Sequence, residues 1–199
     1  MATASQTDLP RSSGDDADRG VQGNERLTAW AGAALLIGFA VEGYTILNVH
    51  WYMAEHILIG MALFLPLGVK LASTIYRFAR YYTNDPAYRR KGPPQLALRV
   101  LAPVLIVNTL VVLLTGVALM ITDSYHRLME DLHKLTFFSW LALFAVHVLA
   151  YVWRLPRLML ADLRGRETSR GDAFRRIAVV TASGLLGLGL AALLPWVRG

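Results

Sequence analysis

Five long apolar runs constrain this 199-residue chain more than any other feature of its sequence. Each run offers roughly 20 mostly apolar residues, enough for a helix to cross a hydrocarbon core of about 30 Å. With 55% hydrophobic residues and a mean hydropathy of +0.41, the chain is too apolar for an ordinary soluble domain. The sequence therefore predicts an all-α integral membrane helical bundle in the plasma membrane, with a four-helix core and a C-terminal packing helix. The expected spans are residues 27–48, 51–73, 99–122, 133–153 and 176–196.

The N-terminal segment differs from the rest in composition. Residues 1–25 hold five acids and two arginines and are rich in small polar residues. A segment of this kind cannot bury enough apolar surface to fold alone, and it is too acidic for a signal peptide. We expect a disordered tail over residues 1–25 and a transmembrane helical domain over residues 26–199.

Basic residues concentrate in two of the loops between the spans. From Lys70 to Arg99 there are seven basic residues against one acid, and residues 154–176 hold seven arginines against three acids. Cytoplasmic loops of membrane proteins carry such an excess. The pattern predicts that both loops are cytoplasmic, with the N-terminus inside and the C-terminus outside. The net charge of +6 then reflects topology and lipid contact, and it is not a sign of nucleic-acid binding. A docking surface for an acidic partner or for haem propionates is the alternative interpretation of the loop 74–99.

The residue types that are missing exclude several kinds of chemistry. The sequence has no cysteine, so disulfides, thiolate-bound clusters, c-type haem attachment and cysteine nucleophiles are excluded. A metal centre would have to use histidine, methionine or carboxylate ligands. The sequence contains no phosphate loop, nucleophile elbow or HExxH motif. We therefore assign no catalytic residue and leave open whether the protein is an enzyme.

Two histidines stand fourteen residues apart in the fourth run, at His133 and His147. On a helix that separation is about 21 Å of rise, and the two side chains lie within about 40° of each other around the axis. The predicted topology places His133 in the outer half of the membrane, level with His56 and Glu42. His50 and His126 are expected near the outer surface, and His50 lies on the opposite helix face from His56 because six residues separate them.

Histidines from different helices at one depth are typical of a b-type haem held by two imidazoles. His56 and His133 are the predicted metal ligands, and Glu42 could hold the second ring nitrogen of one of them. Each group also has a simpler interpretation: the histidines as interfacial polar residues, and Glu42 as a protonated group bound to a neighbouring helix. His147 has no second histidine at its depth, and we expect Asn108 and Lys70 as its neighbours.

The His133–His147 helix and the His56-x-x-x-Gly60 helix resemble the membrane b-type cytochrome superfamily, which includes bacterial cytochrome b561 and the cytochrome b subunits of hydrogenases and formate dehydrogenases. The resemblance implies a helical bundle with one or two haems and ligand roles for His56, His133 and His147. It is partial, because a second histidine fourteen residues after His56 is missing and position 70 is Lys. A second haem would therefore need a non-histidine ligand. Residues 28–155 also resemble small membrane proteins of high-GC Gram-positive bacteria, a likeness that implies no reaction.

These observations favour a membrane electron-transfer subunit with one b-type haem and a second haem as an open alternative. It would pass electrons between the quinone pool and an extracytoplasmic redox partner. The alternative is a cofactor-free membrane scaffold or assembly protein, in which the histidines only bridge helices. A proton-coupled transporter built around Glu42 and His147 is a weaker hypothesis, because five spans without repeats or broken helix pairs do not suit one.

Overall fold

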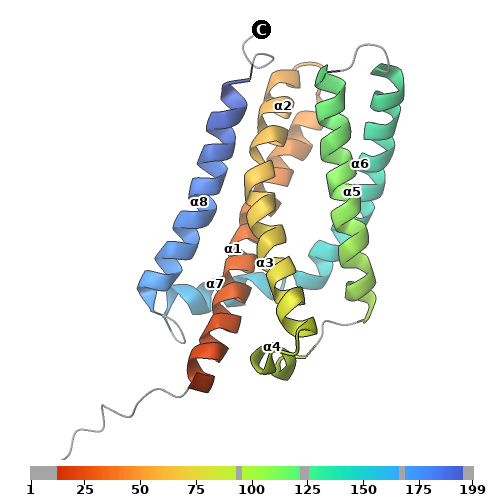
Figure 1. The fold of residues 1–199 in the computed structure, drawn as a ribbon. Coiled ribbons are helices and arrows are strands. Elements are labelled where there is room, and N and C mark those ends of the chain that lie inside the picture. Colours follow the sequence, from red (N-terminus) through yellow and green to blue (C-terminus); the bar gives the residue numbers. More distant parts are fainter. Residues whose placement is uncertain (1–12, 93–95, 122–125, 166–168, 195–199) are drawn as a thin grey trace, which may run out of the picture.

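The computed structural model describes residues 13–92, 96–121, 126–165 and 169–194, and every regular element in these ranges is an α-helix (Figure 1). Five helices are long and apolar enough to cross a membrane, with the second span made of α2 and α3 together. The all-helical membrane bundle predicted from the sequence is confirmed. The helices are α1 (Ser13–Leu47), α2 (Met53–Ala62), α3 (Phe64–Tyr82), α4 (Pro86–Arg90), α5 (Leu96–Ile121), α6 (His126–Tyr151), α7 (Leu155–Leu163) and α8 (Arg170–Ala192).

The second span is interrupted once. α2 ends at Ala62 and α3 begins at Phe64, with Leu63 between them and Pro66 in the first turn of α3. A proline has no N–H to donate to the carbonyl four residues earlier, which here belongs to Ala62, and its ring crowds that carbonyl. Pro66 therefore explains why the helix is interrupted at Leu63.

Some boundaries differ from the sequence prediction. α1 begins at Ser13, so residues 13–25, expected to be disordered, are helical, while residues 1–12 lie outside the described ranges. Contacts with the rest of the chain explain this order, because Val21 packs against Ala87 and Tyr88. α6 begins at His126 rather than at residue 133, and the second basic loop contains the additional helix α7.

The bundle has two parts. α5 and α6 form a closely packed antiparallel hairpin, whereas α1, α2, α3 and α8 pack mainly against one another. In Figure 1 the hairpin lies on one side of α2 and α3, and α8 lies on the other. The last described helix, α8, therefore belongs to the part that contains α1, α2 and α3. At its closest approach to α2, Gly187 lies directly against the backbone of Ala62.

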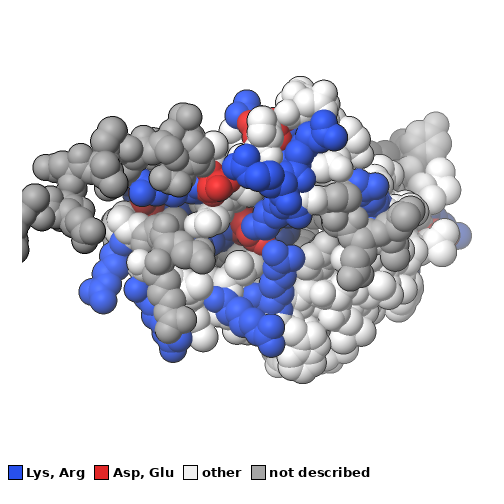
Figure 2. All heavy atoms as spheres, turned by 90° about the horizontal axis from the view of Figure 1, so that it is seen from below, with Lys and Arg blue, Asp and Glu red and all other residues white. Residues whose placement is uncertain are grey.

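One end of the bundle carries most of the described basic side chains. α4 and α7 cover this end, where α1 begins, and α8 ends at the opposite one (Figure 1). Viewed from this side, Lys and Arg side chains spread over much of the surface (Figure 2). We call it the basic end; the charge pattern predicts that it faces the cytoplasm. Asp85 begins α4, since its Oδ1 accepts hydrogen bonds from the N–H groups of Ala87 and Tyr88.

A buried carboxylate ties three helices together at the basic end. Asp162 of α7 is fully buried, and its Oδ1 accepts hydrogen bonds from Arg26 of α1 at 3.1 Å and Arg176 of α8 at 2.5 Å. The indole N–H of Trp30 donates to Oδ2 at 3.0 Å. Buried charges persist in proteins when they are paired and hydrogen-bonded, and this cluster fixes α7 beneath the two transmembrane helices.

Candidate functional site

Two histidines from different parts of the bundle meet near the end opposite the basic end. His56 lies in α2 and His133 lies in α6, and their ring centroids are 6.4 Å apart with the ring planes 82° from each other. Both side chains are half-buried. The shared depth predicted for His56 and His133 is thus realised, and the pair joins the α5–α6 hairpin to the other part of the bundle.

A carboxylate and a hydroxyl hold the ring of His56. Its Nδ1 lies 3.0 Å from Oε1 of Glu42 and 3.2 Å from Oγ1 of Thr45, both on α1. The Thr45 hydroxyl donates to the carbonyl of Glu42 at 2.6 Å, so Glu42 and Thr45 act as one unit. An ionised carboxylate can only accept a hydrogen bond, so Nδ1 is the protonated nitrogen that faces it, and in the neutral ring Nε2 keeps a free lone pair.

The ring of His133 is held in the same way by α5. Its Nδ1 lies 3.0 Å from the backbone carbonyl of Val112 and 3.0 Å from Oγ1 of Thr115. A carbonyl can only accept, so Nδ1 of His133 donates to it and Nε2 again has the lone pair. Both histidines therefore present the tautomer that binds a metal through Nε2, with a hydrogen bond behind each ring.

Two glycines leave room for this arrangement. A Cβ on Gly60 of α2 would lie 3.1 Å from Oε1 of Glu42, and a Cβ on Gly116 of α5 would lie 3.2 Å from Cε1 of His133. Larger residues there would push on the groups that orient the two rings.

The other oxygen of Glu42, Oε2, is buried and has no hydrogen-bond partner among the described residues. The pair therefore has one unsatisfied polar atom beside it.

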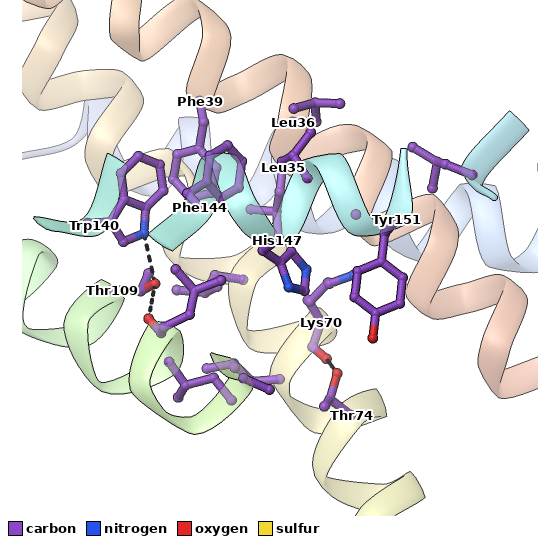
Figure 3. A pocket seen from close by; sticks show the side chains of 18 of the residues that line it. Leu35, Leu36, Phe39, Lys70, Thr74, Thr109, Trp140, Phe144, His147 and Tyr151 are labelled. Atoms are coloured by element: carbon purple, nitrogen blue, oxygen red, sulfur yellow. Dashed lines mark hydrogen bonds between the residues drawn. The ribbon is translucent and has the colours of Figure 1, made fainter. Parts of the chain in front are cut away.

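The other histidines lie elsewhere. His50 and His126 are exposed, and His50 packs edge-on against Trp51 at the end of the bundle. His147 is half-buried further along α6 and lines an apolar cavity of about 170 Å³ between α1, α3, α5 and α6, shown in Figure 3. Within the part of the chain that the structure describes, no hydrogen bond to its ring is present; its ring lies 4.9 Å from that of Tyr151.

Of the two neighbours expected for His147, Lys70 is present and Asn108 is not. Lys70 lines the same cavity, and its Nζ donates to the carbonyl of Thr28 at 3.1 Å. Asn108 is not there. Its amide donates to Oγ of Ser139 at 2.8 Å and to the carbonyl of Thr136, which lie about two and three turns from His147 along α6. The expectation that Asn108 lies beside His147 is therefore wrong, because the register of the hairpin places Asn108 opposite Ser139.

Sequence reasoning missed the two threonines behind the histidines. Thr45 follows Glu42 by three residues on α1, and this one-turn spacing is a signal that could have identified it. Thr115 lies in an apolar span, and nothing in the sequence connects it to His133. The Val112 carbonyl carries no sequence signal, because every residue has one.

Among the described residues, no group of three or more histidine and acidic side chains could hold a bare metal ion. Two imidazoles alone therefore suit a metal whose other ligands come with a cofactor.

One of three comparisons with known proteins identifies a family. No curated protein and no solved structure matches the chain. A family model described as prokaryotic cytochrome b561 matches residues 22–162. The match covers Glu42, His56, His133 and His147, and it ends before α8. Proteins of this kind are multi-pass plasma-membrane electron-transfer proteins that bind b-type haem. With well over half of its length matched, the chain belongs to the prokaryotic cytochrome b561 family.

Proposed function

We propose that this protein carries electrons in the membrane on one b-type haem held by His56 and His133. The observation that supports the proposal is the pairing of these two rings, each with Nδ1 hydrogen-bonded and Nε2 free. Electrons would pass between the quinone pool and an extracytoplasmic redox partner. The position of the pair, near the end of the bundle opposite the basic end, suits a partner on that side.

The spacing of the rings fits such a cofactor. Two metal–nitrogen bonds of about 2 Å each, with about 1 Å from each nitrogen to its ring centre, add to about 6 Å between centroids. The 6.4 Å between His56 and His133 matches that sum. The two rings come from the two parts of the bundle, so a planar group held between them would have helices on both sides.

The bound haem would supply a one-electron carrier, and two histidine ligands would leave it no open position for a small molecule. The chain's own residues set the conditions for this step. Glu42 and Thr45 hold the ring of His56, and the carboxylate increases the electron donation of that imidazole. Thr115 and the Val112 carbonyl hold the ring of His133 in the same way, but neither group carries a full charge.

The cofactor-free scaffold has one observation in its favour. Each histidine already bridges two helices through Nδ1: His56 joins α2 to α1, and His133 joins α6 to α5. In that case the free Nε2 atoms would have no partner to bind. The two functions predict different colours for the purified protein.

The test is reduced-minus-oxidised absorption of protein expressed with haem supplementation. Wild type is expected to show the Soret and α bands of a b-type haem. His56→Ala and His133→Ala should each lose them, because one axial ligand is gone. His147→Ala should keep the outer haem, and His126→Ala is the control for an exposed histidine. A colourless wild type supports the scaffold, and haem loss in His147→Ala alone contradicts the ligand assignment.

A further inference from the structure

A second cavity, of about 190 Å³, opens at the basic end and joins the apolar cavity of Figure 3. Helices α1, α3, α4, α5, α6 and α7 all contribute to its lining. The two cavities share six lining residues, so they form one continuous space from the basic end toward the middle of the bundle. The shared residues are Lys70, Thr74, Ala102, His147, Tyr151 and Leu155.

The charges that line this second cavity are unbalanced. Glu25 is the one acidic side chain among its described lining residues, and it is already paired with Lys91 and Arg154. Arg77 of α3 and Arg99 of α5 are half-buried, and neither has a hydrogen-bond or ion-pair partner in the described ranges. Lys70 adds a third cation that has no carboxylate beside it. Partly desolvated cations without a counter-charge favour binding of an anion.

The shape of the space adds a second requirement. Further from the basic end, the lining of the space becomes apolar, with Leu71, Leu105 and Phe144 among its side chains. A ligand that fills both parts must carry an anionic group at the basic end and an apolar chain that reaches into the bundle. Basic pockets between transmembrane helices on the cytoplasmic side recognise anionic lipid headgroups. The bilayer itself provides such amphiphiles at this depth.

We propose that this cavity binds an anionic phospholipid, with its phosphate between Arg77 and Arg99 and one acyl chain in the apolar part beside His147. A neutral quinone brings no negative charge to Lys70, Arg77 and Arg99, three cations that have no carboxylate partner among the described residues. A haem has carboxylates, but His147 is the one histidine among the described lining residues of both cavities, and the Nζ of Lys70, the possible second ligand, is held by the carbonyl of Thr28. The lipid would neutralise the cations between α3 and α5, and so it would link the two parts of the bundle at the basic end.

The test compares two double variants that each remove two positive charges. Arg77→Gln with Arg99→Gln removes the cations of the cavity. Arg157→Gln with Arg164→Gln is the matched control, because these arginines are exposed at the basic end and line neither cavity. Each protein is reconstituted in phosphatidylcholine with and without phosphatidylglycerol. Bound lipid is counted by native mass spectrometry, and the unfolding temperature is measured alongside.

Phosphatidylglycerol should bind to wild type and to the control and raise their unfolding temperatures. Each basic residue near an anionic headgroup contributes about fivefold in affinity, so the cavity variant should bind about thirtyfold more weakly. If that variant does not fold, each single Arg→Gln change should show the fivefold loss. Equal loss in the control variant would overturn the proposal, because it indicates general surface attraction.

Other occupants give distinct results, each of which contradicts the lipid assignment. Stabilisation of wild type by inorganic phosphate to the same extent indicates a free-anion site. Recovery of a neutral quinone in place of phospholipid indicates a quinone site. A drop from two haems to one in the cavity variant indicates a second haem. Loss of the haem between His56 and His133 is a separate readout that tests the proposed function alone.

Discussion

The carboxylate behind His56 offers a sharp test of the proposed electron carrier. In Glu42→Gln the side chain keeps its size and can still accept a hydrogen bond from Nδ1, but the negative charge is lost. The oxidised haem carries one more positive charge than the reduced one, so the carboxylate stabilises the oxidised form more. Removing the charge should therefore raise the midpoint potential.

The magnitude follows from the burial and contact of Glu42. Its side chain is 14% exposed, and Oε1 lies 3.0 Å from Nδ1 of His56, so solvent screens it weakly. A hydrogen bond to a charged group contributes about 1.5–3 kcal/mol, against about 0.5–1.5 kcal/mol for a neutral one. The change thus weakens the interaction by roughly 1.4 kcal/mol, and if the oxidised form alone loses this amount, the midpoint potential rises by at most about 59 mV for a one-electron couple.

The assay is a redox titration that follows the α band of the purified protein. Glu55→Gln is the matched control, because Glu55 precedes His56 on α2 and is exposed. Its removal takes away the same charge, but solvent screens that charge, and the shift should be much smaller. A Glu42→Gln protein that keeps its haem and shows an unchanged or lower midpoint potential would refute the role given to Glu42.

Three further predictions concern packing and charge. Asp162→Asn should destabilise the protein by about 3–5 kcal/mol in reversible unfolding, because it leaves buried arginine charge without its carboxylate. Gly187→Ala should cost about 1–3 kcal/mol in the same assay, because the new Cβ would lie 2.3 Å from a backbone oxygen of α2, whereas Gly189→Ala meets nothing within 4 Å. Gly116→Ala should lower haem content by pushing on the α6 ligand, and Gly43→Ala, which has open space, should not.

The sequence predicts what depends on distance along a helix. Helix rise converts residue number into depth, and that rule placed His56, His133 and Glu42 at one level before any contact was known. It does not set the rotation of a helix or the register between two helices, which packing decides. Asn108 shows the limit, because pairing with Ser139 places it about 12 Å along α6 from His147.

Long-range pairing accounts for the other differences. Residues 13–25 read as polar and disordered because their partners are distant in sequence: Glu25 pairs with Lys91 and Arg154, and Asp18 pairs with Arg90. Asp162 likewise read as one acid among many arginines in a loop. Its burial depends on residues of α1 and α8 that lie 136 and 14 positions away. Composition alone cannot reveal such pairs.

The placement of α8 has a consequence for the order in which the protein is made. α5 and α6 are neighbours in sequence, so the hairpin can assemble as soon as the ribosome has released it. The part built from α1, α2 and α3 must wait, because the helix that covers it is synthesised after the hairpin. A premature stop before Arg170 would therefore leave the first helices of the chain without their neighbour, although every residue proposed to hold the haem had already been translated.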